Sequence, residues 1–152
     1  ILKKINIMDV VNRSVEFYKI SIKDLDIKLR NKLEQTVFIN GDSEQLYRVF
    51  VNLIKNSIEA IEEEKQKDAN LQGKITLEIY ANNEYIVIKM LDNGIGFDDV
   101  KNITKPYFTT KKKGTGLGLP IVTKIINEHN GDISFLKNPK GAEIVISLPI
   151  FS

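Results

Sequence analysis

The sequence contains no cysteine, no tryptophan, only one histidine and only four prolines among 152 residues. The lack of cysteine excludes a disulfide framework and thiol catalysis, and it fits a reducing compartment. The chain also lacks an apolar run of about 18 residues, the length that a membrane-spanning helix requires. Neither sign of charge dominates, because 22 basic and 20 acidic residues give a net charge of +2. This balance gives no support for nucleic-acid binding or direct membrane contact.

What the sequence does contain is typical of one globular domain. Apolar residues make up 42% and charged residues 28% of a chain whose length is near the usual size of a domain. No internal repeat or linker divides it, so we expect residues 1–152 to form one domain. Because the chain begins with Ile1 instead of Met and has no signal-peptide pattern, we interpret it as a piece of a larger protein.

Hydrophobic periodicity predicts both helices and strands. Apolar residues recur at helical spacing in residues 8–20, in a long segment that begins at Asp42 or Ser43 and ends within 62–68, and from about 117 to 130. Alternating or short apolar runs predict strands at 27–33, 36–40, 75–80, 85–91, 133–137 and 142–148. Residues 93–115 show little periodicity. Loops of that length inside a compact domain are usually functional, for example as a lid.

The predicted long helix carries Asn52 and Asn56, which lie four residues apart and therefore on one face. Asparagine in a helix interior costs about half a kcal/mol relative to alanine, so two in register suggest a purpose. Their amide oxygens can share Mg²⁺ with phosphate oxygens. The alternative is a solvated polar stripe beside the apolar face.

Two glycine-bearing segments follow. In the first, Asp92 lies at the predicted end of a strand and precedes Asn93-Gly94-Ile95-Gly96. Its carboxylate can accept a hydrogen bond from the amino group of adenine and would repel the carbonyl oxygen of guanine. The alternative is a plain Asx turn. The second segment, residues 114–119, alternates glycine with other residues and leads into a helix, an arrangement suited to a triphosphate but also compatible with a flexible connector. His129, at the end of that helix, is interpreted as a capping or partly buried histidine without a catalytic role.

Taken in order, these segments resemble the sequence boxes of bacterial sensor histidine kinases. Residues 46–61 resemble the N box, DNGIGF at 92–97 the G1 box, KPYFTTK at 105–111 the F box, and GTGLGL at 114–119 the G2 box. The variants FTTK and GLGLP are most similar to the nitrogen-regulation branch. Lys105 and Tyr107 depart from the Glu and Phe common in the F box, and Ser57 replaces a common alanine after Asn56.

The resemblance implies a Bergerat fold, an α/β (α+β) two-layer sandwich with a mixed, largely antiparallel sheet, about three helices and a long flexible ATP lid at about 93–116. It implies Mg²⁺ binding by Asn56 with Asn52 nearby, adenine recognition by Asp92, and a lid anchored by Phe108. The implied ATP-binding residues are Asn52, Asn56, Asp92, Gly94, Ile95, Gly96, Phe108, Thr110, Lys111, Gly114, Thr115, Gly116, Leu117, Gly118 and Leu119.

The function implied by the resemblance is transfer of the γ-phosphate of ATP to a histidine. That histidine would belong to a helical-hairpin dimerisation domain of the same protein that is absent from this sequence, and a response regulator would be an indirect partner. Related ATP hydrolases carry a glutamate base one turn before the metal-binding asparagine, where this chain has Asn52. An ATP hydrolase and a nucleotide-sensing module remain alternatives. We expect a cytoplasmic location, with membrane anchoring of the parent protein left open.

Overall fold

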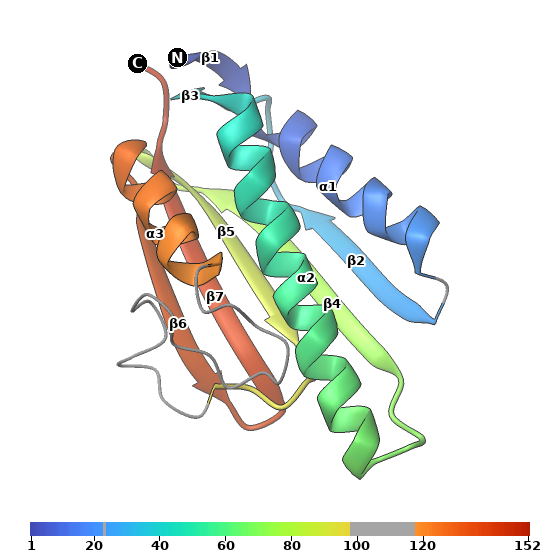
Figure 1. The fold of residues 1–152 in the computed structure, drawn as a ribbon. Coiled ribbons are helices and arrows are strands. Elements are labelled where there is room, and N and C mark those ends of the chain that lie inside the picture. Colours follow the sequence, from blue (N-terminus) through green and yellow to red (C-terminus); the bar gives the residue numbers. More distant parts are fainter. Residues whose placement is uncertain (23, 98–117) are drawn as a thin grey trace.

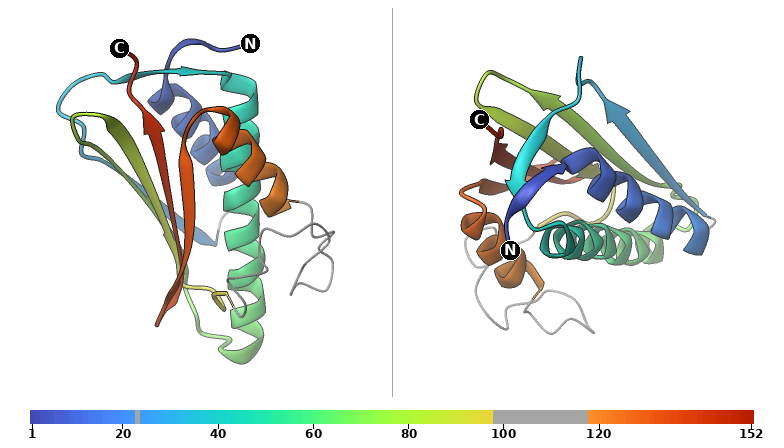
Figure 2. Two further views of the ribbon diagram at one scale, coloured as in Figure 1. Left: turned by 90° about the vertical axis from the view of Figure 1, so that its left-hand side faces the viewer. Right: turned by 90° about the horizontal axis from the view of Figure 1, so that it is seen from above.

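The computed structural model describes residues 1–22, 24–97 and 118–152. Their helices lie on one face of a sheet, so the molecule has two layers (Figures 1 and 2). The elements are β1 (Lys3–Asn6), α1 (Ile7–Ser21), β2 (Leu25–Asn31), β3 (Phe38–Gly41), α2 (Ser43–Lys67), β4 (Gly73–Ala81), β5 (Tyr85–Asp92), α3 (Gly118–Glu128), β6 (Asp132–Asn138) and β7 (Gly141–Pro149).

The main sheet has five strands in the order β2-β4-β5-β7-β6. Only the pair β2 and β4 is parallel, and the other neighbours in this sheet are antiparallel. The predicted two-layer fold, with a mixed, largely antiparallel sheet on three helices, is therefore confirmed for the described residues. The order brings the end of β5, at Asp92, beside the start of β7, at Ala142.

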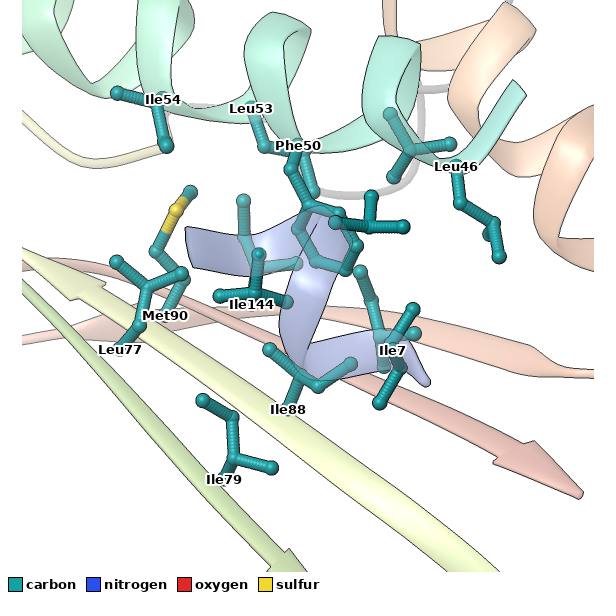
Figure 3. Close-up of a cluster of buried hydrophobic side chains, with 14 of the residues drawn as sticks. Ile7, Leu46, Phe50, Leu53, Ile54, Leu77, Ile79, Ile88, Met90 and Ile144 are labelled. Atoms are coloured by element: carbon teal, nitrogen blue, oxygen red, sulfur yellow. The ribbon is translucent and has the colours of Figure 1, made fainter. Parts of the chain in front are cut away.

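The core lies between the helices and the sheet. Strands β4, β5 and β7 bury every second side chain, because only one face of the sheet is covered. From α2, Phe50 and Leu53 point into this layer toward Ile88 and Ile144 (Figure 3). Burying a side chain of this size contributes about 1.5–3 kcal/mol, so these contacts fix the rotation of α2 about its axis.

Helix α2 begins where the sequence predicts. Asp42 is its N-cap, and the carboxylate accepts hydrogen bonds from the backbone N–H groups of Glu44 and Gln45 at 3.1 and 3.2 Å. These bonds satisfy donors that have no partner inside the helix. Core packing and capping together hold α2 in place as the support for the site described below.

Strand β1 was not predicted, whereas β3 corresponds to the strand predicted at 36–40. Strand β1 pairs with β3 as a separate antiparallel sheet, beside which both termini of the chain lie (Figure 1). Strand β1 has only four residues, two of them exposed, and therefore shows no clear alternation. Within the described residues, no helix combines the length and the apolar character needed to cross a membrane.

Candidate nucleotide-binding site

Asn52 and Asn56 lie on one side of α2, and both are partly buried. Their neighbours Leu53 and Ser57 are buried at 1% and 2% relative exposure, so the two amides lie at the border between the core and the open side of the helix. At four residues apart they are separated by about 6 Å along the helix axis. Two amide groups are thus presented next to each other by a helix whose rotation is fixed.

Asp92 is the last residue of β5, and one of its carboxylate oxygens accepts a hydrogen bond from the N–H of Gly94 at 2.9 Å. The Asx turn considered from the sequence is therefore present. Asn93 fastens the same turn to β4, because its side-chain oxygen accepts from the N–H of Lys74 at 2.9 Å and its amide donates to the carbonyl of Gln72 at 2.8 Å. A carboxylate has several acceptor positions, so the turn does not prevent Asp92 from recognising a ligand donor.

The turn after Asp92 packs directly on α2. The N–H of Ile95 donates to the carbonyl of Ala60 at 3.2 Å. A Cβ atom added to Gly94 would lie 2.5 Å from the carbonyl carbon of Ala60 and 2.7 Å from the backbone nitrogen of Ile61. Only glycine permits this approach of backbone to backbone. Because Ala60 follows Asn56 by one helical turn, the strand end that carries Asp92 lies close to the paired amides.

The start of α3 approaches α2 at the same place. Gly118 is the first residue of α3, and a Cβ atom added to it would lie 3.9 Å from the side-chain nitrogen of Asn56. Leu119, the next residue, is partly buried and packs against the core. The free N–H groups at the beginning of a helix attract anions. Asn56 therefore lies next to the start of α3 and one helical turn before Ala60, on which the turn after Asp92 packs.

Several predicted residues lie outside the described residues. They are Phe108, Thr110, Lys111, Gly114, Thr115, Gly116 and Leu117. Of the predicted lid at about 93–116, residues 93–97 are described, and they pack against the domain. Gly96 has a positive φ of 78°. The rings of Phe97 and Phe135 make an edge-to-face contact, with their centroids 5.8 Å apart.

The residues present fit a magnesium ion that takes few protein ligands. The described residues contain no group of three or more His, Cys, Asp or Glu side chains that could hold a metal. Mg²⁺ commonly binds one or two protein oxygens and completes its octahedron with water and phosphate oxygens. The side chain of Asn56, whose amide nitrogen lies near the start of α3, offers one oxygen that suits this coordination, with Asn52 one turn away.

Two carboxyl groups with shifted pKa values lie away from these residues. Backbone N–H donation, chiefly from Gln45, lowers the pKa of Asp42. Lys32, whose ammonium lies 2.8 Å from Glu78, lowers the pKa of that carboxyl group. Both charges support local structure at the N-cap of α2 and on β4.

Two residues that shape the site, Ala60 and Gly141, were not among the residues predicted from the sequence. A Cβ atom on Gly141, which has a φ of 151°, would collide with the carbonyl oxygen of Asp92. Gly141, the first residue of β7, therefore lets this strand approach Asp92 closely. Ala60 accepts the bond from Ile95, but an alanine on an apolar helix face gives no signal of such a contact.

Comparison with known families agrees with this geometry. The model of the HATPase_c family, described as histidine kinase-, DNA gyrase B-, and HSP90-like ATPase, matches residues 41–151. That range contains α2, Asp92 and the start of α3. The chain belongs to this family. The expected relationship to histidine kinases is thereby confirmed at the level of the family, while assignment to the nitrogen-regulation branch stays a prediction.

Among related proteins, sporulation kinase C of Bacillus subtilis (strain 168) is 39% identical over 75% of this chain. Sensor histidine kinase ZraS of Salmonella typhi is 34% identical over 99% of this chain. The chain spans only 26% of the length of the first protein and 32% of the second. The relatives therefore extend well beyond the part that corresponds to this domain.

Solved structures show the same fold. The catalytic domain of histidine kinase ThkA has a TM-score of 0.83 at 24% identity, with 98% of this chain and 95% of that chain covered. The mycobacterial sensor histidine kinase MprB has a TM-score of 0.82 at 21% identity, with 99% and 98% covered. At these identities the comparison establishes the arrangement of helices and strands.

Proposed function

We propose that this chain binds ATP with Mg²⁺ and places the γ-phosphate for transfer to a histidine on a helical-hairpin dimerisation domain of the same protein. It would be the catalytic part of a two-component sensor histidine kinase. The observation that carries the proposal is that α2 contacts both the turn after Asp92 and the start of α3. Groups suited to adenine, metal and phosphate therefore lie along one helix.

Each group has a distinct task in this proposal. The carboxylate of Asp92 accepts a hydrogen bond from the adenine amino group. Gly94 and Gly96 shape the pocket beside it, because each lets the turn approach neighbouring backbone closely. The N–H groups at the start of α3 receive phosphate oxygens, as helix N-termini do in other nucleotide sites. Asn56 holds Mg²⁺, which when bound offsets the charge of the phosphates.

Asn52 favours transfer to an external acceptor over hydrolysis. An amide cannot take a proton from water near neutral pH, so Asn52 cannot serve as the general base that hydrolysing relatives place one turn before the metal ligand. Phosphoryl transfer depends mostly on positioning and on neutralising charge. The domain would thus keep ATP intact until a histidine reaches the γ-phosphate.

The relatives support the wider assignment. Several of them are sensor or sporulation kinases, and ThkA has been solved in complex with the response regulator TrrA. We propose by analogy that residues 1–152 form one ATP-binding domain, that it works in the cytoplasm, and that a response regulator receives the phosphate from the histidine domain. The response regulator would then be an indirect partner of this domain.

The test is a transfer experiment with ATP labelled at the γ-phosphate. The purified chain is mixed with Mg²⁺, labelled ATP and a separately purified histidine-bearing hairpin domain, with a hairpin lacking that histidine as control. Acid-labile label on the intact hairpin alone supports the proposal. ATP binding without label would favour a nucleotide-sensing module. Steady phosphate release by the chain alone, at many turnovers per minute, would favour an ATP hydrolase.

A further inference from the structure

His129 is buried at 5% relative exposure at the C-terminal end of α3. Both ring nitrogens have backbone partners: Nδ1 lies 2.8 Å from the carbonyl oxygen of Ile125, and Nε2 lies 3.0 Å from the backbone nitrogen of Asp42. The first contact stays within one turn of α3. The second joins α3 to a residue 87 positions earlier in the chain.

The backbone partners determine which nitrogen of the ring carries the proton. The N–H of Asp42 can only donate, so Nε2 must accept with its lone pair. The carbonyl of Ile125 can only accept, so Nδ1 must carry the hydrogen. The imidazole is therefore neutral, with both nitrogens used. It acts as a rigid connection between two backbone segments.

This connection joins the two helices of the candidate site. Asp42 is the N-cap of α2. The opposite end of α3, its N-terminal end at Gly118, lies beside Asn56. Figure 1 shows α3 alongside α2 and running in the opposite direction, and a left-handed Asn130 with a φ of 57° ends α3 after His129. Because α3 is only about 15 Å long, a change of angle at one end displaces the other end.

We propose that His129 is a positioning residue for the triphosphate. By joining the end of α3 to the cap of α2, it sets the angle between the helices and hence the distance from the start of α3 to Asn56. This inference rests on the proposed binding of ATP. It predicts that His129 affects recognition of the phosphates and leaves recognition of adenosine, through Asp92, unchanged.

Two substitutions separate the two hydrogen bonds. The side chain of His129→Gln is long enough to place an acceptor near the position of Nε2, where it can receive the hydrogen bond from Asp42. The shorter side chain of His129→Asn extends only to the position of Nδ1. A surface cavity of about 180 Å³ adjoins His129, so water can enter the space that the shorter side chain leaves. Ser14→Ala is the matched control, because it removes a buried side-chain hydrogen bond, to Val10, from the separate helix α1.

The experiment measures the Kd of ATP with Mg²⁺ by calorimetry and that of adenosine by NMR titration, on folded samples of each variant. We expect His129→Asn to bind ATP about tenfold more weakly, as loss of one well-made hydrogen bond implies. Its affinity for adenosine should not change, and His129→Gln and Ser14→Ala should bind both ligands like the unmodified chain. Equal losses for ATP and adenosine, or no loss, would overturn the positioning role.

A second measurement needs no variant. Nitrogen–nitrogen coupling across the hydrogen bond, between the backbone nitrogen of Asp42 and Nε2 of His129, should be observed in the unmodified chain with and without ATP. Its absence in both states would also overturn the inference. If the unmodified chain failed to bind ATP at all, the proposed function would fall first, which distinguishes the two failures.

Discussion

Replacement of Gly94 by alanine tests whether the turn after Asp92 depends on its contact with α2. The added methyl carbon would lie 2.5 Å from the carbonyl carbon of Ala60, 2.7 Å from the nitrogen of Ile61 and 2.8 Å from the Cβ of Ala60. The two nearest atoms belong to the backbone of a capped and well-packed helix, so they cannot move aside cheaply. The turn must therefore shift away from α2.

The cost follows from the contacts that this shift removes. Overpacking costs about 1–3 kcal/mol, and loss of the bond from Ile95 to Ala60 costs about 0.5–1.5 kcal/mol more. We expect Gly94→Ala to lower the free energy of unfolding, measured in urea, by about 1.5–4.5 kcal/mol. Since Asp92 would move relative to Asn56, the affinity for ATP measured by calorimetry should fall by about tenfold or more.

Two controls make the result specific. Gly118→Ala adds a methyl group whose nearest described neighbour is 3.9 Å away, so the free energy of unfolding should change by no more than about 0.5 kcal/mol. Adding Ala60→Gly to Gly94→Ala should not restore stability, because it removes only the third-nearest atom. Unchanged stability and ATP affinity in Gly94→Ala, or full rescue by Ala60→Gly, would refute the argument that backbone contact positions the turn.

Three further outcomes are expected. Asp92→Asn keeps the turn but weakens the bond to adenine by about 1.5–3 kcal/mol, and unchanged ATP affinity in calorimetry would contradict the adenine assignment. Asn56→Ala should weaken ATP binding far more with Mg²⁺ than with EDTA, and equal losses would remove its metal role. Because the pKa of Asp42 is lowered, its contribution is complete above the ordinary value of 3.8 and is lost as the pH falls through the lower folded value. In the unmodified chain, the urea midpoint of unfolding should therefore fall more steeply below pH 3.8 than in Asp42→Ser, whose N-cap side chain does not titrate. Parallel curves for the two proteins would contradict this contribution of Asp42.

The elements with strong periodicity could be predicted from the sequence. The helix predicted at 8–20 is α1 at Ile7–Ser21, and the predicted strand at 85–91 is β5 at Tyr85–Asp92. Such segments are predictable because one face is buried and the other is not, which leaves a repeating pattern. Strand β1 left no such pattern and was missed.

The order of the strands could not be derived from the same pattern. Alternation shows which side chains of a strand face the core, but it does not show which strand is the neighbour. β5 pairs with β7, and β2 pairs in parallel with β4, across segments that contain a helix or a long connection. The fold class came from the resemblance to a family, which supplies the order as a whole.

The candidate site was predictable in its residues but not in its contacts. Asp92 and Asn56 stood out because their residue types and positions suit a ligand. Their closeness depends on Gly94 packing on Ala60 and on Gly141 packing on Asp92, contacts between segments far apart in sequence. A sequence indicates that a glycine is needed at such a position, but it does not name the backbone that the glycine approaches.

The glycines of the site differ in what requires them. Packing alone requires Gly94 and Gly141, because a Cβ at either position would collide with backbone. Gly118 is different, since a Cβ there would make only an ordinary contact, at 3.9 Å, with the nearest described atom, the side chain of Asn56. Alanine would also favour the helix that Gly118 begins. Gly118 also lies next to an amide suited to a metal. Under the proposed function, the close approach of a phosphate to the start of α3 would explain why glycine stands at this position.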